Sequence, residues 1–437
     1  MPSPGMRTDR YELTMLDASL ADGTAGRPVV FEAFARSVPG DGTFGVVGGT
    51  DRVVEAIAGF SFNVDDLAWL GSAGVVSQGC LDYLASYRFG GTVRGYPEGE
   101  VFFAGSPVLS VAGTFAEAVV IETVVLSILN HGCAVATAAA RIRQIAGDAT
   151  LLEMGSRRGH EEAAVEVARL AWVGGFDATS NLAAGQRFGV PTVGTAAHAW
   201  TLVHDDEQEA FGAQLAALGP ATTLLVDTYD IATGIERAVA AARLVGVAGP
   251  GAVRIDSGDL EAEARHGRAQ LDRLGAQATR IVVSGDLDRA KVAQLRRARA
   301  PIDGFGVGSH LVAAPPAGFV YKLVAVGDGN GLRPVEKRSA SLGKASSGGT
   351  KTAWRTTGAD GSIASEVLTV DASPPAGAYP VAVPLLDGAV RAGSTTFGAQ
   401  STAAARDRCS TAVATVRVPV HIEVRTGAGS ARQEKTP

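Results

Sequence analysis

A histidine follows a short glycine- and threonine-containing segment in the string GTAAHAW, residues 194–200. Backbone amides around Gly194 and Thr195 could bind an anion, and imidazole is the side chain best suited to accept and release a phosphoryl group near neutral pH. An isolated histidine near a helix start is also commonly structural. Because His198 is predicted to lie at the end of a strand, we favour the interpretation that it accepts a phosphoryl group.

A second group of polar residues lies in VRIDSGDL, residues 253–260. In an extended chain, Arg254 and Asp256 point to the same side, so a guanidinium fork and a carboxylate can contact one ligand. Ser257 allows close approach of the backbone, and Asp259 is a candidate helix N-cap. Capping would account for Asp259 alone, so Arg254 and Asp256 are candidate ligand-binding residues.

Two later strand ends carry SGD and GVGS. Such endings, followed by a helix start, commonly hold a phosphate on backbone amides and a hydroxyl group, although Gly and Ser also end ordinary strands. The candidate phosphate-binding residues are Ser284, Gly285, Asp286, Gly306, Gly308 and Ser309.

Other polar positions leave two interpretations open. Asp227 is predicted to follow a strand, with either a magnesium-linked or a purely structural role. Arg157 also follows a predicted strand, where it could neutralise a carboxylate or phosphate or begin a solvated helix. The basic loop of residues 336–351 suits a nucleotide or pyrophosphate, or is a mobile surface loop. Its candidate nucleotide-binding residues are Lys337, Lys344 and Lys351.

The elements that must position these residues are short apolar runs that alternate with helix-like stretches between about residues 151 and 326. This alternation predicts parallel βα units and favours a closed or nearly closed barrel, whose strand ends would form one active site. An open doubly wound sheet is the alternative, but its GxGxxG fingerprint is missing. The predicted strands are 150–158, 190–198, 222–230, 252–259, 280–286, 304–310 and 321–326.

The fold class is therefore α/β: an irregular (β/α) barrel with a flanking α+β N-terminal domain and a small C-terminal segment. Residues 28–115 mix strand-like runs with a helical patch near 50–60, and β-like runs at 365–371 and 411–424 follow the barrel. The predicted divisions are an N-terminal domain 1–120, a barrel 121–338, a β-rich segment with the basic loop 339–424, and a disordered tail 425–437.

Composition limits the classes of partner and compartment. The 437 residues carry a net charge of −6, so the chain has no general basic field and we expect no nucleic-acid partner. Three widely spaced cysteines fit a reducing compartment. The first ten residues lack a signal-like apolar stretch, and the apolar run 118–129 is too short to span a bilayer, so we expect a cytoplasmic protein without a membrane partner.

The ordered strings closely resemble the nicotinate phosphoribosyltransferase family, within the type II phosphoribosyltransferases. The likeness runs from TDRYELTML (8–16) through LLEMGSRR, GGFDATSN, GTAAHAW, LLVDTYD, VRIDSGDL, DGFGVGSH and GFVYKLVAV to the loop 337–355, about three quarters of the chain. The resemblance implies an irregular α/β barrel with an N-terminal domain, assembled as a homodimer whose active sites are shared. It implies an ATP-dependent ligase that forms nicotinate mononucleotide in NAD salvage.

The resemblance also implies roles for individual residues. His198 would be phosphorylated by ATP, and Arg254 and Thr195 would contact nicotinate, with Arg157 a further candidate. Tyr11 would reach across the interface and stack on the pyridine ring. The 5-phosphate would lie at the GVGS ending, and Asp256 with the SGD ending would line the ribose and pyrophosphate. Mg²⁺ would be held through substrate phosphates, with Asp256 or Asp286 as protein ligands.

Two departures and several alternatives remain. Gly348 and Gly349 stand where relatives often have Pro-Gly, and Cys409 stands alone where many relatives have a zinc-binding cysteine cluster.

Two alternatives belong to the same class of enzyme. One is a nicotinamide-specific enzyme, in which Glu153 could bind the amide, and the other is a quinolinate enzyme. An aldolase-like barrel would need a strand-borne lysine such as Lys322. A non-catalytic barrel is the third possibility.

Overall fold

The computed structural model describes residues 3–39, 42–337, 347–388, 390–391 and 396–426. The chain forms two compact units, Met1–Thr137 with Pro315–Pro437, and Ala138–Ala314. We call them unit 1 and unit 2. These boundaries differ from the predicted domains, because residues after 315 belong with the N-terminal part of the chain rather than with the barrel.

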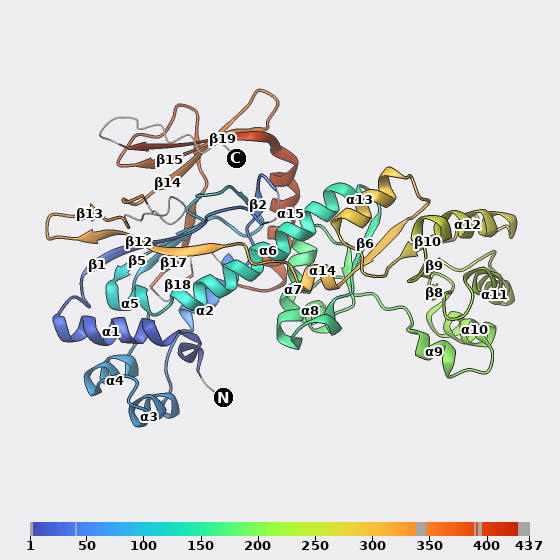
Figure 1. The fold of residues 1–437 in the computed structure, drawn as a ribbon, viewed down its shortest axis with the longest axis horizontal. Helices are drawn as coiled ribbons and strands as arrows, with labels where there is room; N and C mark the ends of the chain where they lie inside the picture. The colour runs from blue at the N-terminus through green and yellow to red at the C-terminus, as the bar shows by residue number, and fades with distance from the viewer. Residues whose placement is uncertain (1–2, 40–41, 338–346, 389, 392–395, 427–437) are drawn as a thin grey trace. The chain divides into compact units, whose positions relative to one another are not determined.

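Unit 1 contains a seven-stranded antiparallel sheet in the order β13-β12-β1-β5-β3-β17-β18 (Figure 1). Its strands are β1 (Pro28–Ala35), β3 (Thr92–Gly95), β5 (Leu109–Thr114), β12 (Phe319–Gly327), β13 (Leu332–Pro334), β17 (Val383–Asp387) and β18 (Val390–Arg391). The predicted barrel strand 321–326 is therefore wrong, because it lies within β12, whose partner is the N-terminal strand β1. The stacked rings of Phe31 and Tyr321, 4.6 Å apart, reinforce this pairing within the core.

A second sheet of unit 1 is built from the C-terminal part of the chain. It has the order β16-β14-β15-β19, with β14 (Thr352–Thr357), β15 (Ile363–Val370), β16 (Tyr379–Pro380) and β19 (Val416–Thr426). Helix α15 (Ala399–Thr415) precedes β19, so the predicted β-like run 411–424 is wrong for residues 411–415. The predicted tail begins inside β19 at residues 425–426, and residues 427–437 lie outside the described residues.

The remaining elements of unit 1 include a short β2–β4 ladder and the helices around the seven-stranded sheet. They are η1 (Pro4–Arg7), α1 (Arg10–Asp22), β2 (Gly45–Val46), α2 (Thr50–Ala58), α3 (Val64–Ser72), α4 (Gln78–Ala85), β4 (Val101–Phe102) and α5 (Phe115–Val119). The predicted mixture of strands and a helix near 50–60 is confirmed.

A buried ionic network stabilises the C-terminal sheet against residues 96–106 of the same unit. Arg355 in β14 donates two hydrogen bonds of 2.9 Å to Glu366 in β15 and one of 2.8 Å to Glu100. Tyr96 donates to the other oxygen of Glu366 at 3.0 Å. Because Arg355 and Glu366 are almost fully buried, each charge needs the other for compensation.

Helix α6 (Glu122–Ala146) runs from unit 1 into unit 2. Among the described helices, it is long and apolar enough to cross a membrane, but 61% of its most apolar window is buried within the structure. Core helices of folded proteins satisfy the same criterion, so the helix is weak evidence for a membrane span.

Unit 2 contains six parallel strands in the order β7-β6-β11-β10-β9-β8. They are β6 (Thr150–Glu153), β7 (Ala178–Thr179), β8 (Thr223–Leu225), β9 (Ala252–Ile255), β10 (Arg280–Val283) and β11 (Gly304–Val307). The last strand, β11, pairs with the first, β6, which is the cyclic order of a barrel. The fold class is thus confirmed as α/β and barrel-like with an N-terminal domain.

The barrel has a seam between β7 and β8, which are the two ends of the hydrogen-bonded sheet. The predicted strand 190–198 falls at this seam, and within the described residues its one strand-like contact is the bridge between Thr179 and Thr192. Residue 198 begins helix α9 (His198–Leu202) instead of ending a strand. The strand prediction is therefore wrong for most of this segment.

Helices follow the strands in regular alternation, with α10, α11 and α12 on the outer side of β8 and β9 (Figure 1). Aspartate side chains cap the starts of α10 to α13, which stabilises the turn from strand to helix. The remaining elements are η2 (Ser156–Arg158), α7 (Glu161–Val173), α8 (Leu182–Phe188), α9 (His198–Leu202), α10 (Glu207–Leu218), α11 (Ile231–Leu244), α12 (Leu260–Arg273), α13 (Arg289–Arg297) and α14 (Ser309–Val312).

Candidate active site

The candidate site in unit 2 is built at the carboxyl ends of β8 to β11. Arg254 lies in β9, Asp256 follows it, and Ser284 follows β10. Because β9 and β10 are parallel and in register from residues 252 and 280, their ends meet at one edge of the sheet. The structure therefore brings together residues that the sequence separates by about thirty positions.

The guanidinium group of Arg254 is fixed by three neighbours. Its Nε donates to Ser284 Oγ at 2.8 Å, Nη1 to Thr195 Oγ1 at 3.3 Å, and Nη2 to Asp256 Oδ1 at 3.1 Å. A guanidinium has five N–H groups, so within the described residues these bonds leave one on each terminal nitrogen. Two N–H groups on neighbouring nitrogens of a guanidinium can together bind a carboxylate.

Asp256 completes the same network. Its Oδ1 accepts hydrogen bonds from both Arg254 and Ser284. Burial alone would raise the pKa of Asp256, but the hydrogen bonds from Ser284 and Arg254 outweigh it and hold the pKa below its ordinary value. Asp256 is therefore a carboxylate at neutral pH, and in the described part of the chain its hydrogen bonds from side chains go to Oδ1.

His198 begins α9 and meets the end of β8. Its Nδ1 lies 3.1 Å from Thr228 Oγ1, and its Nε2 lies 3.9 Å from Asp227 Oδ1. The imidazole is 43% exposed, whereas the carboxylate of Asp227 is 1% exposed. One edge of the ring thus faces a buried carboxylate, Nδ1 contacts Thr228, and part of the ring is exposed to solvent.

Asp227 links this histidine to the end of β9. Its Oδ2 accepts the backbone N–H of Asp256 at 2.9 Å and the hydroxyl of Ser257 at 2.7 Å. Its Oδ1 is buried and has no hydrogen-bond partner among the described residues. The role of Asp227 was left open from the sequence, although its position at a strand end was the signal that could have placed it in the site.

The two predicted phosphate-binding turns lie next to each other. Ser309 donates to Asp286 Oδ1 at 3.3 Å, which joins the turn after β11 to the turn after β10. Gly285 has a φ of 106°, and a side chain there would collide with the carbonyl of Asp256. Asp286 follows with a φ of 45°, which is uncommon for a residue other than glycine. Gly306 and Gly308 occupy β11 and the residue before α14.

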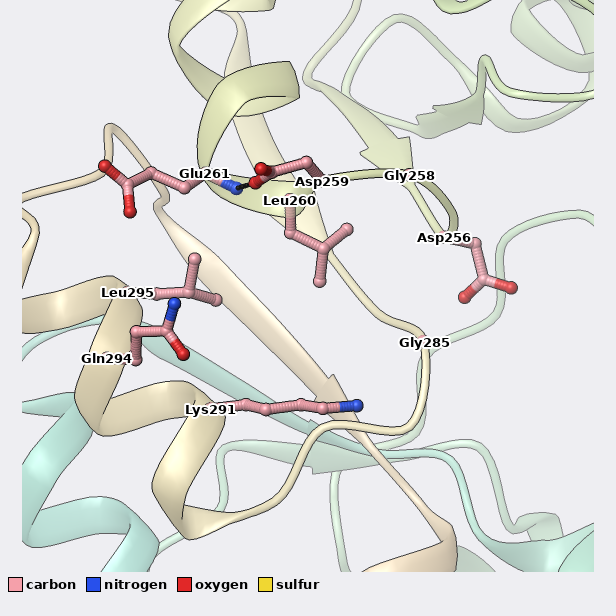
Figure 2. A pocket seen from close by; sticks show the side chains of 9 residues that line it. All are labelled: Asp256, Gly258, Asp259, Leu260, Glu261, Gly285, Lys291, Gln294 and Leu295. Atoms are coloured by element: carbon pink, nitrogen blue, oxygen red, sulfur yellow. Dashed lines mark hydrogen bonds between the residues drawn. The ribbon is translucent and has the colours of Figure 1, made fainter.

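One cavity lies beside the turn after β10, and another lies near the end of β8. A cavity of about 210 Å³ lies between the starts of α12 and α13, where the side chain of Lys291 extends towards Gly285 and donates to the carbonyl of Asp286 at 2.9 Å (Figure 2). Asp259 lies on the rim of this cavity and accepts hydrogen bonds from two backbone N–H groups of α12. The predicted capping role of Asp259 is therefore confirmed. A second cavity of about 560 Å³ lies between Asp227 and helices α11 and α12.

The other predicted site residues belong to the turn after β6 or to unit 1. Arg157 is in the exposed turn after β6 in unit 2, whereas Tyr11, Lys337 and Lys351 belong to unit 1. Lys344 lies outside the described residues. The predicted roles of these residues as ligand contacts remain predictions.

Lys351 has a buried position. Its ammonium lies 2.9 Å from Glu32 Oε2 and donates to the carbonyls of Ser347 and Gly349. The side chains of Lys351 and Glu32 are 7% and 0% exposed. Because an ammonium has three donors and all three are used, the geometry favours a structural role for this lysine.

The structure also shows the surroundings of Cys409 and of the two residues that the alternative functions would require. Lys322 lies in the antiparallel strand β12, not in a barrel strand, which removes the residue that an aldolase-like barrel would need. Glu153 is buried, and its two oxygens accept hydrogen bonds from Gly155 and Thr179. Cys409 is buried and unbridged.

Comparison with known proteins agrees with this arrangement. Residues 6–130 match the model of the nicotinate phosphoribosyltransferase N-terminal domain. The chain is 53% identical over 382 residues to a nicotinate phosphoribosyltransferase of Mycobacterium tuberculosis, covering 85% of this chain and 82% of the relative. It is 36% identical over 360 residues to the Bacillus subtilis enzyme of that name, covering 81% and 73% of the two chains.

A solved structure gives the same result at the level of the fold. The crystal structure of human nicotinic acid phosphoribosyltransferase superposes with a TM-score of 0.80 at 26% identity and covers 94% of both chains. With the strand-end site, the barrel order of the sheet and these similarities taken together, the chain belongs to the nicotinate phosphoribosyltransferase family.

Proposed function

We propose that the protein is a nicotinate phosphoribosyltransferase, which joins nicotinate to phosphoribosyl pyrophosphate and releases pyrophosphate in NAD salvage. The observation that best supports this proposal is the fixed guanidinium of Arg254. Its two remaining N–H groups suit the carboxylate of nicotinate. Nicotinamide lacks that negative charge, so the same group favours the acid over the amide. The relatives named above carry this activity in their names.

The sugar and phosphates would bind at the adjoining turns. The pyridine nitrogen forms the new bond to C1 of the ribose while the bond to pyrophosphate breaks, so positive charge develops on the sugar and negative charge on the leaving group. Asp256 is suited to hold ribose hydroxyls, and the paired turns of Asp286 and Ser309 are suited to the phosphates.

Magnesium fits this donor set. No group of three or more His, Cys, Asp or Glu side chains that could hold a metal occurs within the described ranges. Mg²⁺ commonly binds through one or two carboxylates together with substrate phosphates. Asp256 or Asp286 would hold the ion, which would neutralise charge on the departing pyrophosphate.

ATP hydrolysis would be coupled to the reaction through His198. The buried carboxylate of Asp227 near Nε2 would keep a proton on that nitrogen and repel a phosphoryl group there. Nδ1, whose neighbour is the movable hydroxyl of Thr228, is then the nitrogen that accepts the phosphoryl group. Phosphorylation would add about two negative charges beside the site, which could order magnesium and the loops that bind the sugar.

The site would be completed in a homodimer. Tyr11 is an exposed aromatic residue, and we propose that it stacks on the pyridine ring in the partner subunit's site.

The three buried, unbridged cysteines also fit the reducing conditions of the cytoplasm, where we expect the enzyme to act.

The alternatives predict different substrates. Glu153 has both oxygens engaged, so it offers little to a nicotinamide amide group. Quinolinate has a second carboxylate, which would need another basic residue. Arg157 is a candidate to bind that carboxylate, but its side chain is exposed. Competition among the three bases in one assay would distinguish these enzymes.

The test is product formation from nicotinate, phosphoribosyl pyrophosphate and Mg²⁺, with and without ATP. We expect nicotinate mononucleotide in both assays, with ATP stimulating its formation. His198→Ala should retain basal activity at high phosphoribosyl pyrophosphate and lose the stimulation. Absence of the mononucleotide would reject the proposed activity, whereas full ATP stimulation in the variant would reject the role of His198.

A further inference from the structure

The turn after β10, residues 285–287, has an unusual backbone conformation. Gly285 has a φ of 106° and Asp286 a φ of 45°. Glycine adopts positive φ angles without strain, but a residue with a Cβ does so rarely and keeps that conformation only where its surroundings fix it. The conformation of this turn, which we call the Asp286 turn, therefore depends on its contacts with other residues of unit 2.

Two of these contacts come from residues of the candidate site. The carbonyl oxygen of Asp256 lies so close that a Cβ on Gly285 would be 2.5 Å from it. The hydroxyl of Ser309 donates to Asp286 Oδ1 at 3.3 Å. The first contact places Gly285 against the end of β9, and the second holds the side chain of Asp286.

A third contact comes from Lys291 in α13, which is not among the predicted site residues. Its Nζ donates to the backbone carbonyl of Asp286 at 2.9 Å, and its side chain extends along the 210 Å³ cavity towards Gly285 (Figure 2). Because the donor is an ammonium group, this is a charge-assisted hydrogen bond, which is stronger than one between neutral groups.

The backbone of Lys291 is held as well. Its N–H donates to Oδ1 of Asp288, the N-cap residue of α13, at 2.7 Å. The lysine side chain therefore extends from a capped helical turn and reaches back over five residues to the Asp286 carbonyl. This arrangement joins the Asp286 turn to the start of α13.

We infer that Lys291 is a positioning residue, which holds the Asp286 turn in the conformation that binds the phosphates of phosphoribosyl pyrophosphate. This inference rests on the proposed function. A turn that is fixed before the ligand arrives loses less conformational freedom on binding, which strengthens binding.

The effect should be specific for one of the two substrates. The guanidinium of Arg254, proposed to bind nicotinate, contacts Ser284 rather than the Asp286 turn. The backbone N–H of Ser284 donates to the carbonyl of Ile255 at 3.0 Å, so Ser284 is held by strand β9. Loss of Lys291 should therefore weaken binding of phosphoribosyl pyrophosphate more than binding of nicotinate.

Steady-state kinetics without ATP test this expectation, because phosphorylation of His198 then makes no contribution. Lys291→Met keeps an unbranched side chain and a good helix former but loses the ammonium group. Its KM for phosphoribosyl pyrophosphate should rise about fivefold, the loss expected for one hydrogen bond, with smaller changes in kcat and in the KM for nicotinate. Lys291→Arg retains a charged donor and should recover most of the loss.

Salt separates the hydrogen bond from a long-range attraction between the ammonium and the phosphates. Salt screens attraction between exposed charges, whereas it has much less effect on a contact within the protein. The ratio of the KM values of Lys291→Met and the unaltered enzyme should therefore persist as KCl is raised. A ratio that falls to one at high salt would overturn the positioning role.

Hydrogen exchange of the ligand-free protein tests the turn directly. Backbone amides of residues 285–288 should exchange faster in Lys291→Met, because the turn opens more often without its clamp. Gln294→Met is the matched control, since Gln294 lines the same cavity one turn further along α13. It should change neither the exchange of the turn nor the KM for phosphoribosyl pyrophosphate.

The possible failures are distinguishable. Unchanged exchange of residues 285–288 in Lys291→Met, or an unchanged KM for phosphoribosyl pyrophosphate, would overturn the positioning role. Absence of mononucleotide formation by the unaltered enzyme would instead reject the proposed function. The exchange measurement needs no substrate, so its result does not depend on that activity.

Discussion

Nε2 of His198 lies 3.9 Å from the buried Oδ1 of Asp227, while Nδ1 of the same ring faces the hydroxyl of Thr228. The two edges of the imidazole therefore have different electrostatic surroundings. Under the proposed function, the carboxylate would favour a proton on Nε2 and leave Nδ1 as the nitrogen that accepts the phosphoryl group.

The first prediction concerns the isomer of phosphohistidine. With ATP and Mg²⁺, isomer-specific detection should find the phosphoryl group on Nδ1 of His198. Asp227→Asn should reduce phosphohistidine formation by about tenfold or more, because the amide no longer stabilises the positively charged ring. Ser257→Ala is the control, since it removes a contact to Asp227 Oδ2 but keeps the carboxylate. Phosphorylation on Nε2 would contradict this arrangement.

A second prediction concerns selectivity for the base. Arg254→Lys keeps the positive charge but loses the fork, so the KM for nicotinate should rise about tenfold or more. Arg254→Gln should also narrow the preference for nicotinate over nicotinamide. Both effects are measured as kcat/KM for each base, with circular dichroism to verify folding. An unchanged preference in Arg254→Gln would show that another group binds the carboxylate.

A third prediction tests the shared site by mixing subunits. Tyr11→Ala and Arg254→Gln chains should each be weakly active alone. If each site takes Tyr11 from the partner, random mixing should restore about one quarter of the unaltered activity, because half the dimers then contain one intact site. The measurement is activity after the two variants are unfolded and refolded together. Mixtures that gain no activity would place Tyr11 and Arg254 in one chain's site.

A fourth prediction concerns Lys351 and Glu32. Lys351→Met leaves the buried carboxylate of Glu32 without its partner, which should destabilise the fold by about 3 kcal/mol or more. The double variant Glu32→Gln with Lys351→Met should recover part of that loss. Thermal midpoints measure both effects. A Lys351→Met protein of unaltered stability with a raised KM for ATP would instead support the nucleotide-binding role predicted from sequence.

A fifth prediction concerns pH and Glu12. Burial raises the pKa of this carboxyl from its ordinary value of 4.5 to about 7, with hydrogen bonds from Thr123 and Thr8 partly opposing the rise. Its stabilising contribution is therefore complete below pH 4.5 and is lost as pH rises through about 7. Glu12→Gln should remove this dependence, so its stability relative to the unaltered protein should increase between pH 4 and 8 by at most about 3 kcal/mol. Parallel pH profiles of the thermal midpoint would contradict the raised pKa.

Several candidate site residues were predictable from sequence because their conformation depends only on neighbouring residues in the chain. Asp259 could be identified as a cap, and Arg254 with Asp256 as a same-side pair, since strand alternation and helix-start chemistry act over a few residues. The βα rhythm likewise predicted the parallel strands of unit 2. The ordered motifs indicated the family, which the comparisons confirmed.

The tertiary structure decided what depends on contacts between distant residues. The apolar run at 321–326 has the pattern of any buried strand, and only its pairing with β1 separates it from the barrel. Lys351 looks like a loop cation in sequence, but Glu32, more than three hundred residues earlier, buries it in an ion pair. Asp227 acquired its place because β8 and β9 are neighbours, which brings its carboxylate between His198 and Ser257. Sequence patterns identify the residue types and their local conformation, whereas strand pairing and burial determine which of them meet.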